Sequence, residues 1–434
     1  MREIHAAKSL LKSKLYPAVL QWPTLIVFTL ILYSLLHGTP DAGKNLGAVL
    51  TWFLWWPALG LLFFLAGRIW CATCPFSLIS DWVQKAVGNN LPAPKLVKRH
   101  GAWLIIGLFV LLTWCEDVFD IVHSTLSTGV LLLVIITGVV ASGAFFERRT
   151  WCRYMCPLGG MAGIYSKVGV FQLRGTLDKC LTCKSVECYR GGSGGPGCSM
   201  FEFPRILASN ANCNMCGACV KNCPNESVVI SVRAPARELW TTNKPRLEES
   251  FLAAIMAAVL LILNTLEVVK DWLPGLLGGG NAAVGFSLFY FVSLCIPAIL
   301  MLAAAKAASH YTGSQTRANF VRFGLALIPV VLAAHIGHTG KEFLEKGRLI
   351  PYSVTSFFHP ETPAPASLSI LGDEGILVIH LLLYAAGSLL SGYTAWRIAR
   401  ANYRPEKRTF FMIPFLTLLA IFSGLNILLI LSAE

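Results

Sequence analysis

The chain has 434 residues, of which 55% are hydrophobic and only 14% are charged, and its mean hydropathy is +0.61. About a quarter of the residues of a soluble domain are charged, so this composition excludes a soluble globular protein and predicts an α-helical polytopic membrane protein. The net charge of +13 does not indicate nucleic-acid binding, because the basic residues lie in short segments between apolar runs, as the positive-inside rule predicts.

About nine apolar runs are long enough to cross the ~30 Å hydrocarbon core of a membrane as helices. They are Ala18–His37, Gly47–Ala66, Ala102–Ile121, Thr128–Phe146, Phe251–Val269, Phe286–Ala305, Phe320–His338, Ile376–Ala399 and Phe410–Leu431. The first run is too long for a signal peptide and no A-x-A cleavage site follows it, so it is read as an uncleaved span. The basic loops then place the N-terminus on the cytoplasmic side of a bacterial-type inner membrane.

Three parts are expected along the chain. Residues 1–170 form a four-helix membrane unit with two parallel repeats, residues 171–247 form an inserted cytoplasmic ferredoxin-like domain, and residues 248–434 form a C-terminal membrane domain of about five helices. Each repeat has two spans and ends in a similar phrase, "RIWCATCP" from Arg68 to Pro75 and "RTWCRYMCP" from Arg149 to Pro157.

The two Cys-Pro motifs form the first candidate site. Cys71 and Cys74 are three residues apart and Cys152 and Cys156 are four apart, so each pair is predicted to lie on one helix face. Two pairs from a repeat can converge into one four-thiolate site, which could hold a further Fe–S cluster or copper, or could remain two redox-active dithiols. If these four cysteines only packed as small apolar side chains, the repetition of the phrase would have no explanation. Packing is, by contrast, the role expected of Cys115.

The segment "CNMCGACVKNCP", from Cys213 to Pro224, has the C-x2-C-x2-C-x3-C-P spacing of bacterial ferredoxins, in which the fourth cysteine binds the other of two clusters. A zinc knuckle would use paired C-x2-C units instead. The metal ligands are therefore predicted to be Cys180, Cys183, Cys188, Cys198, Cys213, Cys216, Cys219 and Cys223. Two [4Fe–4S] clusters are expected, one on Cys180, Cys183, Cys188 and Cys223 and the other on Cys198, Cys213, Cys216 and Cys219.

Ionisable residues near the outer ends of several spans form a third candidate site. Ionisable groups inside a span are costly and often mark a pathway, and imidazoles can bind haem b or a quinone. The candidates are Glu116, Asp117, His123, His335, His338 and His380. The alternative is that the acidic residues are solvated at the end of a span and that the histidines lie at the headgroup boundary without a ligand.

The two Cys-Pro motifs and the cysteines from Cys180 to Cys223 resemble one family, the membrane polyferredoxins of the NapH/NosR type, over about Gly47 to Val232. The resemblance implies electron transfer between the quinone pool or the cytoplasm and periplasmic reductases. It also implies redox partner subunits, such as an outer-face cytochrome or reductase and a cytoplasmic donor. The second motif, "CRYMCPLGG", is close to the family pattern, whereas "CATCPFS" is one residue shorter.

The sequence thus predicts a membrane electron-transfer subunit, an oxidoreductase component similar to a quinol dehydrogenase. One alternative is a maturation factor that handles or reduces copper, resembling the polyferredoxin that assists oxidase assembly. Another is a transporter with regulatory clusters, which the parallel repeat permits but no substrate motif supports.

Overall fold

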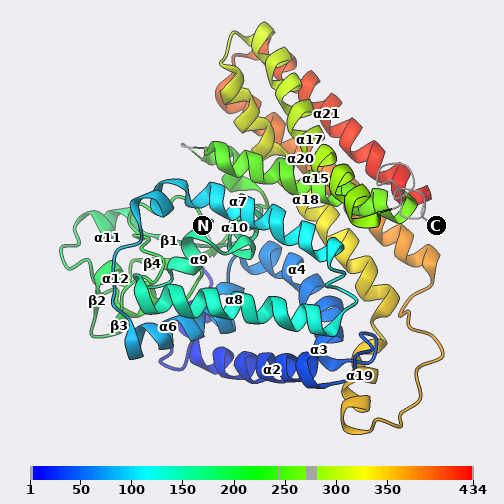
Figure 1. The fold of residues 1–434 in the computed structure, drawn as a ribbon. Coiled ribbons are helices and arrows are strands. Elements are labelled where there is room, and N and C mark those ends of the chain that lie inside the picture. Colours follow the sequence, from blue (N-terminus) through cyan, green and yellow to red (C-terminus); the bar gives the residue numbers. More distant parts are fainter. Residues whose placement is uncertain (1–2, 243–244, 270–280, 433–434) are drawn as a thin grey trace. The chain divides into compact units, whose positions relative to one another are not determined.

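The structure is a computed structural model that describes residues 3–242, 245–269 and 281–432. Within these ranges nine helical segments are long and apolar enough to cross a membrane, and each overlaps one of the nine predicted runs. They are α2 (Ala18–His37), the composite segment Leu46–Ala66, α7 (Lys95–Val118), α8 (Thr125–Phe145), α15 (Leu247–Val269), α17 (Ala282–Thr312), α18 (Thr316–Lys346), α20 (Asp373–Asn402) and α21 (Pro405–Ser432) (Figure 1). The prediction of a mostly helical, multi-pass membrane protein is confirmed.

The second span is composed of three helical pieces. These are α3 (Leu46–Val49), the π-helix η1 (Leu50–Trp55) and α4 (Trp56–Ala66). The Asn45 side chain begins the segment by accepting a hydrogen bond of 3.1 Å from the Ala48 amide, which is the usual way to satisfy a free amide at a helix start. π-helical turns are rare and often occur at functional sites, and this one carries Trp52.

Several short helices connect the spans and the inserted domain. They are α1 (His5–Lys12), α5 (Trp70–Thr73), α6 (Pro75–Val87), α9 (Thr150–Tyr154), α10 (Pro157–Tyr165), α11 (Leu177–Leu181), α12 (Glu187–Arg190), α13 (Ala218–Lys221), α14 (Arg237–Thr241) and α19 (Leu349–Phe358). α19 contacts α3 and η1, where Leu349 and Tyr352 pack against Val49.

The inserted segment is held together by a small antiparallel sheet. β1 (Phe171–Gly175) pairs with β4 (Val228–Val232), in a register that places Leu173 opposite Ile230. These two side chains are buried in one apolar cluster with Val228 and Cys219. Two short strands, β2 (Gly191–Gly192) and β3 (Gly195–Pro196), pair within a glycine-rich stretch of this segment.

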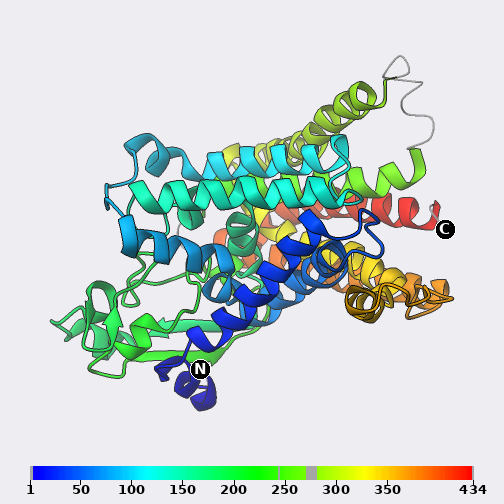
Figure 2. The same cartoon turned by 60° about the horizontal axis from the view of Figure 1, so that its bottom comes forward.

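The N-terminal segment packs on the inserted domain. The Ile4 amide donates to the Ile230 carbonyl at 2.9 Å, and α1 contacts β4 and α13 (Figure 2). The fully buried Tyr16 hydroxyl donates to the Met215 carbonyl at 2.8 Å. Residues at the start of the chain therefore support the loop that contains Cys213 and Cys216.

The chain forms two compact units. The first comprises Met1–Thr39, Leu61–Leu108 and Thr128–Glu238, and the second comprises Pro40–Gly60, Phe109–Ser127 and Leu239–Glu434. The first unit contains both Cys-Pro motifs and all eight ferredoxin-type cysteines. In the second unit the central helix is α18, which contacts α15, α17, α20 and η1 and is largely buried.

Candidate functional site

Each Cys-Pro motif lies where one helix ends and the next begins. Cys71 is in α5 and Cys152 is in α9, whereas Cys74 and Cys156 are the N-caps of α6 and α10. The prediction that each pair shares one helix face is wrong, because proline cannot continue a helix and instead starts the next one at its first position. The Cys156 sulfur accepts a hydrogen bond from the Gly159 amide at 3.3 Å.

The four thiols of these motifs converge in the first unit. Cys71, Cys152 and Cys156 all lie close enough to Cys74 to raise its pKa further, although burial is the largest cause. Burial likewise raises the pKa of Cys152 to about 11 and that of Cys156 to about 12. Since the thiolate is the form that binds metal, Cys74, Cys152 and Cys156 would have to release their protons when a metal or cluster binds.

Two buried arginines border these four thiols. Arg68 and Arg149 occupy equivalent positions in the two Arg-x-Trp-Cys phrases and are 3% and 4% exposed. Arg149 forms a two-point ion pair with Asp81, at 3.1 and 2.6 Å, and also donates to the Cys71 carbonyl at 3.3 Å. Sequence reasoning missed both arginines as site residues, although their repetition was the available signal.

The eight cysteines of the inserted domain lie in two groups. Cys180, Cys183 and Cys223 are near enough to Cys188 to raise its pKa to about 11, with burial as the first cause. Ser227 joins two members of this group, since its hydroxyl lies 3.3 Å from the Cys180 sulfur and 3.2 Å from the Cys223 sulfur.

The second group surrounds Cys219, which is buried. Burial is the main cause that raises the pKa of Cys219, and the neighbouring thiols Cys213, Cys216, Cys198 and Cys188 raise it further. Cys188, which belongs to the first group, is also a neighbour of Cys219, so the division of the eight cysteines into two ligand sets stays a prediction. Within the described residues, no three His, Cys, Asp or Glu side chains are gathered so tightly that they could hold a single metal ion.

A buried carboxylate organises the loop that leads into Cys213. Glu238 is 3% exposed, and its carboxylate accepts hydrogen bonds from the Asn210 amide at 3.1 Å and from the Ser209 hydroxyl. It is also ion-paired with Arg233 and, at 3.1 Å, with Arg174. Burial alone would raise the pKa of Glu238, but Arg233 and Ser209 hold it below the ordinary value.

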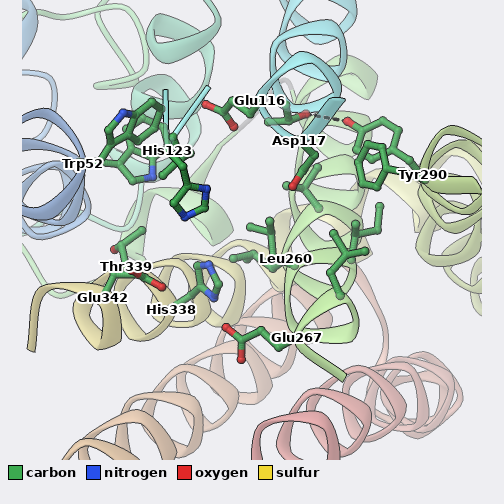
Figure 3. Close-up of a pocket in the computed structure, with 18 of the residues that line it drawn as sticks. Trp52, Glu116, Asp117, His123, Leu260, Glu267, Tyr290, His338, Thr339 and Glu342 are labelled. Atoms are coloured by element: carbon green, nitrogen blue, oxygen red, sulfur yellow. Dashed lines mark hydrogen bonds between the residues drawn. The ribbon is translucent and has the colours of Figure 1, made fainter. Parts of the chain in front are cut away.

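The third candidate site corresponds to a cavity of about 680 Å³ within the second unit. Five of the six predicted residues line it: Glu116, Asp117, His123, His335 and His338. Figure 3 shows Glu116 and Asp117 on one side of the cavity and His338 with Glu267 on the other. Drug-sized ligands occupy cavities of roughly 300–1,000 Å³, so the cavity can hold a small organic molecule.

The walls of this cavity combine aromatic and polar groups. Trp52 and Trp56 come from the second span, and Tyr290 comes from α17. The Tyr290 hydroxyl lies 2.6 Å from the Thr113 hydroxyl. Sequence reasoning missed these residues, together with Glu267 and Glu342, because nothing in their spacing shows that α15, α17 and α18 meet here.

His380, the sixth predicted residue, lies next to the cavity and does not line it. It is 3% exposed, and its ring lies so close to Gly337 that a methyl group on that glycine would be 2.4 Å from it. Within the described residues, the buried His380 Nε2 and His338 Nδ1 have no hydrogen-bond partner. Cys115 and Cys295 do not join any of these groups; Cys295 is exposed and donates to the Phe291 carbonyl at 3.5 Å.

Comparison with known proteins gives two matches to one family, described as a 4Fe-4S binding domain, at residues 48–94 and 128–174. Each matched range contains a membrane span followed by a Cys-Pro motif, as the internal repeat predicts. The inserted cysteines from Cys180 to Cys223 lie outside both ranges, so their interpretation depends on their spacing and grouping.

Three curated relatives are similar to this chain. The methylamine utilization ferredoxin-type protein MauN of Paracoccus denitrificans is 26% identical over 46% of the chain and 62% of its own length. The putative electron transport protein YccM of Escherichia coli is 29% identical over 25% of the chain and 29% of its own length. The ferredoxin-type protein NapH of Escherichia coli is 23% identical over 40% of the chain and 65% of its own length.

The chain therefore spans less than two thirds of each of these relatives, and no solved structure matches it. The resemblance to the NapH type that the cysteine motifs predicted is confirmed. The chain is a multi-pass membrane protein that carries two matches to a 4Fe-4S binding domain and is distantly similar to the ferredoxin-type proteins NapH and MauN.

Proposed function

We propose that the protein is a membrane electron-transfer subunit that exchanges electrons between a quinone and [4Fe–4S] clusters. The observation that carries the proposal is the convergence of the four Cys-Pro thiols in the two segments that match a 4Fe-4S binding domain. We assign a third [4Fe–4S] cluster to Cys71, Cys74, Cys152 and Cys156. The two groups in the inserted domain each take one cluster, and the clusters supply one-electron redox chemistry.

The quinone is assigned to the cavity in the second unit. A quinone is a flat apolar ring with an oxygen at each end, so its site needs aromatic walls and polar groups on opposite sides. Trp52 and Trp56 supply the walls, and His338, with its unpartnered Nδ1, lies across the cavity from Glu116 and Asp117. Oxidation of one quinol releases two electrons and two protons, and these side chains are placed to receive the protons.

A quinone fits the second unit better than haem b. Two imidazoles that bind one haem iron must face each other across the porphyrin. The His380 ring instead lies directly against the Gly337 backbone of α18, which leaves no space for a macrocycle between His380 and the helix that carries His335 and His338. No step of the proposed reaction therefore passes through haem.

The orientation of the chain is part of the proposal. The basic loops support a cytoplasmic N-terminus and inserted domain, and in this orientation the quinone cavity would lie toward the outer face. Redox partners would then meet the clusters from the cytoplasm, while an outer-face cytochrome or reductase would meet the second unit.

Reduction of the clusters by quinol tests the proposal. Purified protein in detergent is mixed anaerobically with a short-chain quinol, and bleaching of the cluster absorption is followed with time. His338→Ala should slow the bleaching at least tenfold, while dithionite still reduces all clusters. Wild-type rates in His338→Ala would contradict the quinone assignment, and stoichiometric copper in place of iron on the Cys-Pro thiols would favour a copper-handling factor.

A further inference from the structure

Arg68 connects the four Cys-Pro thiols to the inserted domain. It follows Gly67, whose φ of +61° lies in the left-handed region that glycine adopts without strain, so the chain turns sharply as it leaves α4. The buried guanidinium lies close to Cys71, Cys152 and Cys156. Its Nη1 also donates to the Ala211 carbonyl, two residues before Cys213.

The equivalent arginine of the second repeat has a different environment. Arg149 is paired at two points with Asp81, so its charge is compensated. Among the described residues Arg68 pairs with no carboxylate, and its Nε is buried without a hydrogen-bond partner. The first repeat therefore places one uncompensated positive charge beside the four thiols.

We propose that Arg68 is a positioning residue that sets the reduction potential of the four-cysteine site and couples this site to the Cys198–Cys213–Cys216–Cys219 group. The inference depends on the cluster assigned above to the Cys-Pro thiols. Each one-electron reduction makes such a cluster one unit more negative without breaking a bond. A nearby positive charge in a poorly solvated site stabilises that added charge strongly, and hydrogen bonds to cluster sulfurs raise potentials in the same way.

The location of Arg68 explains why the coupling would reach the inserted domain. Gly67 lies near Asn210 and Met215, and Arg68 binds Ala211 between them. Arg149 in turn is close to both Cys152 and Cys216. The loop from Asn210 to Cys216 thus contacts the same two arginines that border the Cys-Pro thiols, which suits a direct electron step between the two sites.

An EPR-monitored redox titration of the purified full-length protein tests the inference. In Arg68→Gln, the reduction equilibrium constant of the Cys-Pro site should fall at least tenfold, which is about 59 mV for a one-electron step. Arg68→Lys should restore most of the loss because it keeps the charge. The midpoint potential of the cluster assigned to Cys180, Cys183, Cys188 and Cys223 should not change. Arg322→Gln, which removes an arginine hydrogen-bonded to Tyr403 and Asn402, is the matched control.

A second variant should change the reduction potential of the Cys-Pro site in the opposite direction. Asp81→Asn removes the partner of Arg149 and should raise this potential, and the result does not depend on whether Arg68→Gln folds. An unchanged potential in both variants, or equal effects of Arg68→Gln and Arg68→Lys, would overturn the role of Arg68. If Cys71→Ala and Cys156→Ala remove no EPR signal, the cluster assignment itself is wrong, and this inference falls with it.

Discussion

Replacement of Glu238 by glutamine should release the loop that leads into the second ferredoxin-type group. The substitution keeps the shape of the side chain but removes the charge that Arg174, Arg233, Ser209 and the Asn210 amide all approach. Breaking a buried ion pair by neutralising one partner costs about 3–5 kcal/mol. The main reason is that Arg233, which is 4% exposed, would remain charged without a carboxylate.

This cost has a definite pH dependence. The pKa of Glu238 is below its ordinary value in the folded protein, and a glutamate in an unfolded chain titrates near pH 4.3. The stabilisation is therefore fully present above about pH 4.3 and is lost as the pH falls through the folded-state pKa. Glu238→Gln should lack this acid-dependent component of stability.

The assay is thermal release of the clusters, followed by visible absorption between pH 3 and pH 8. Glu238→Gln should release clusters at a markedly lower temperature at neutral pH, and the difference from the wild type should shrink in acid. Glu226→Gln, which removes the exposed partner of Lys12, is the control and should behave as the wild type. Equal cluster release in Glu238→Gln and the wild type at pH 7 would refute the role given to this carboxylate.

Three further predictions follow from single contacts. Tyr16→Phe should weaken the inserted domain by about 1–3 kcal/mol, because it leaves the Met215 carbonyl buried without its donor; urea-induced cluster loss measures this, and an unchanged midpoint would contradict it. Gly337→Ala should displace His380 and weaken quinone binding at least tenfold in a titration. Gly340→Ala is the control, because a methyl group there meets nothing within 4 Å, and it should bind quinone as the wild type does. Equal quinone affinities of the two variants would contradict the packing of His380 against Gly337. Cys74→Ala and Cys156→Ala should each lose the Cys-Pro cluster signal in EPR and retain the signals of the inserted domain, and retention of all signals would show that these thiols only pack.

Hydropathy was sufficient to locate the spans but not their ends. α17 continues to Thr312 and α18 to Lys346, beyond the predicted limits at Ala305 and His338, because polar residues extend a helix without adding to its apolar run. α6 is not among the predicted spans because Asp81 and Lys85 interrupt its apolar residues.

The candidate sites were predictable to different degrees. The repeated phrase led to the four Cys-Pro residues, and spacing led to the eight inserted cysteines, because such ligands are close in sequence. The partners of the two arginines could not be predicted. Arg149 binds Asp81, which is 68 residues away in sequence, and Arg68 binds Ala211, which is 143 residues away. The cavity likewise requires knowledge of which faces of α15, α17 and α18 pack together.

The most direct test of the central claim is the iron, acid-labile sulfide and copper content of the purified protein. Three [4Fe–4S] clusters would give about twelve irons and twelve sulfides per chain. About eight of each should remain when Cys71→Ala, Cys74→Ala, Cys152→Ala and Cys156→Ala are combined. The same iron content in the wild type and in this variant, or copper bound to the Cys-Pro thiols in place of iron, would contradict it.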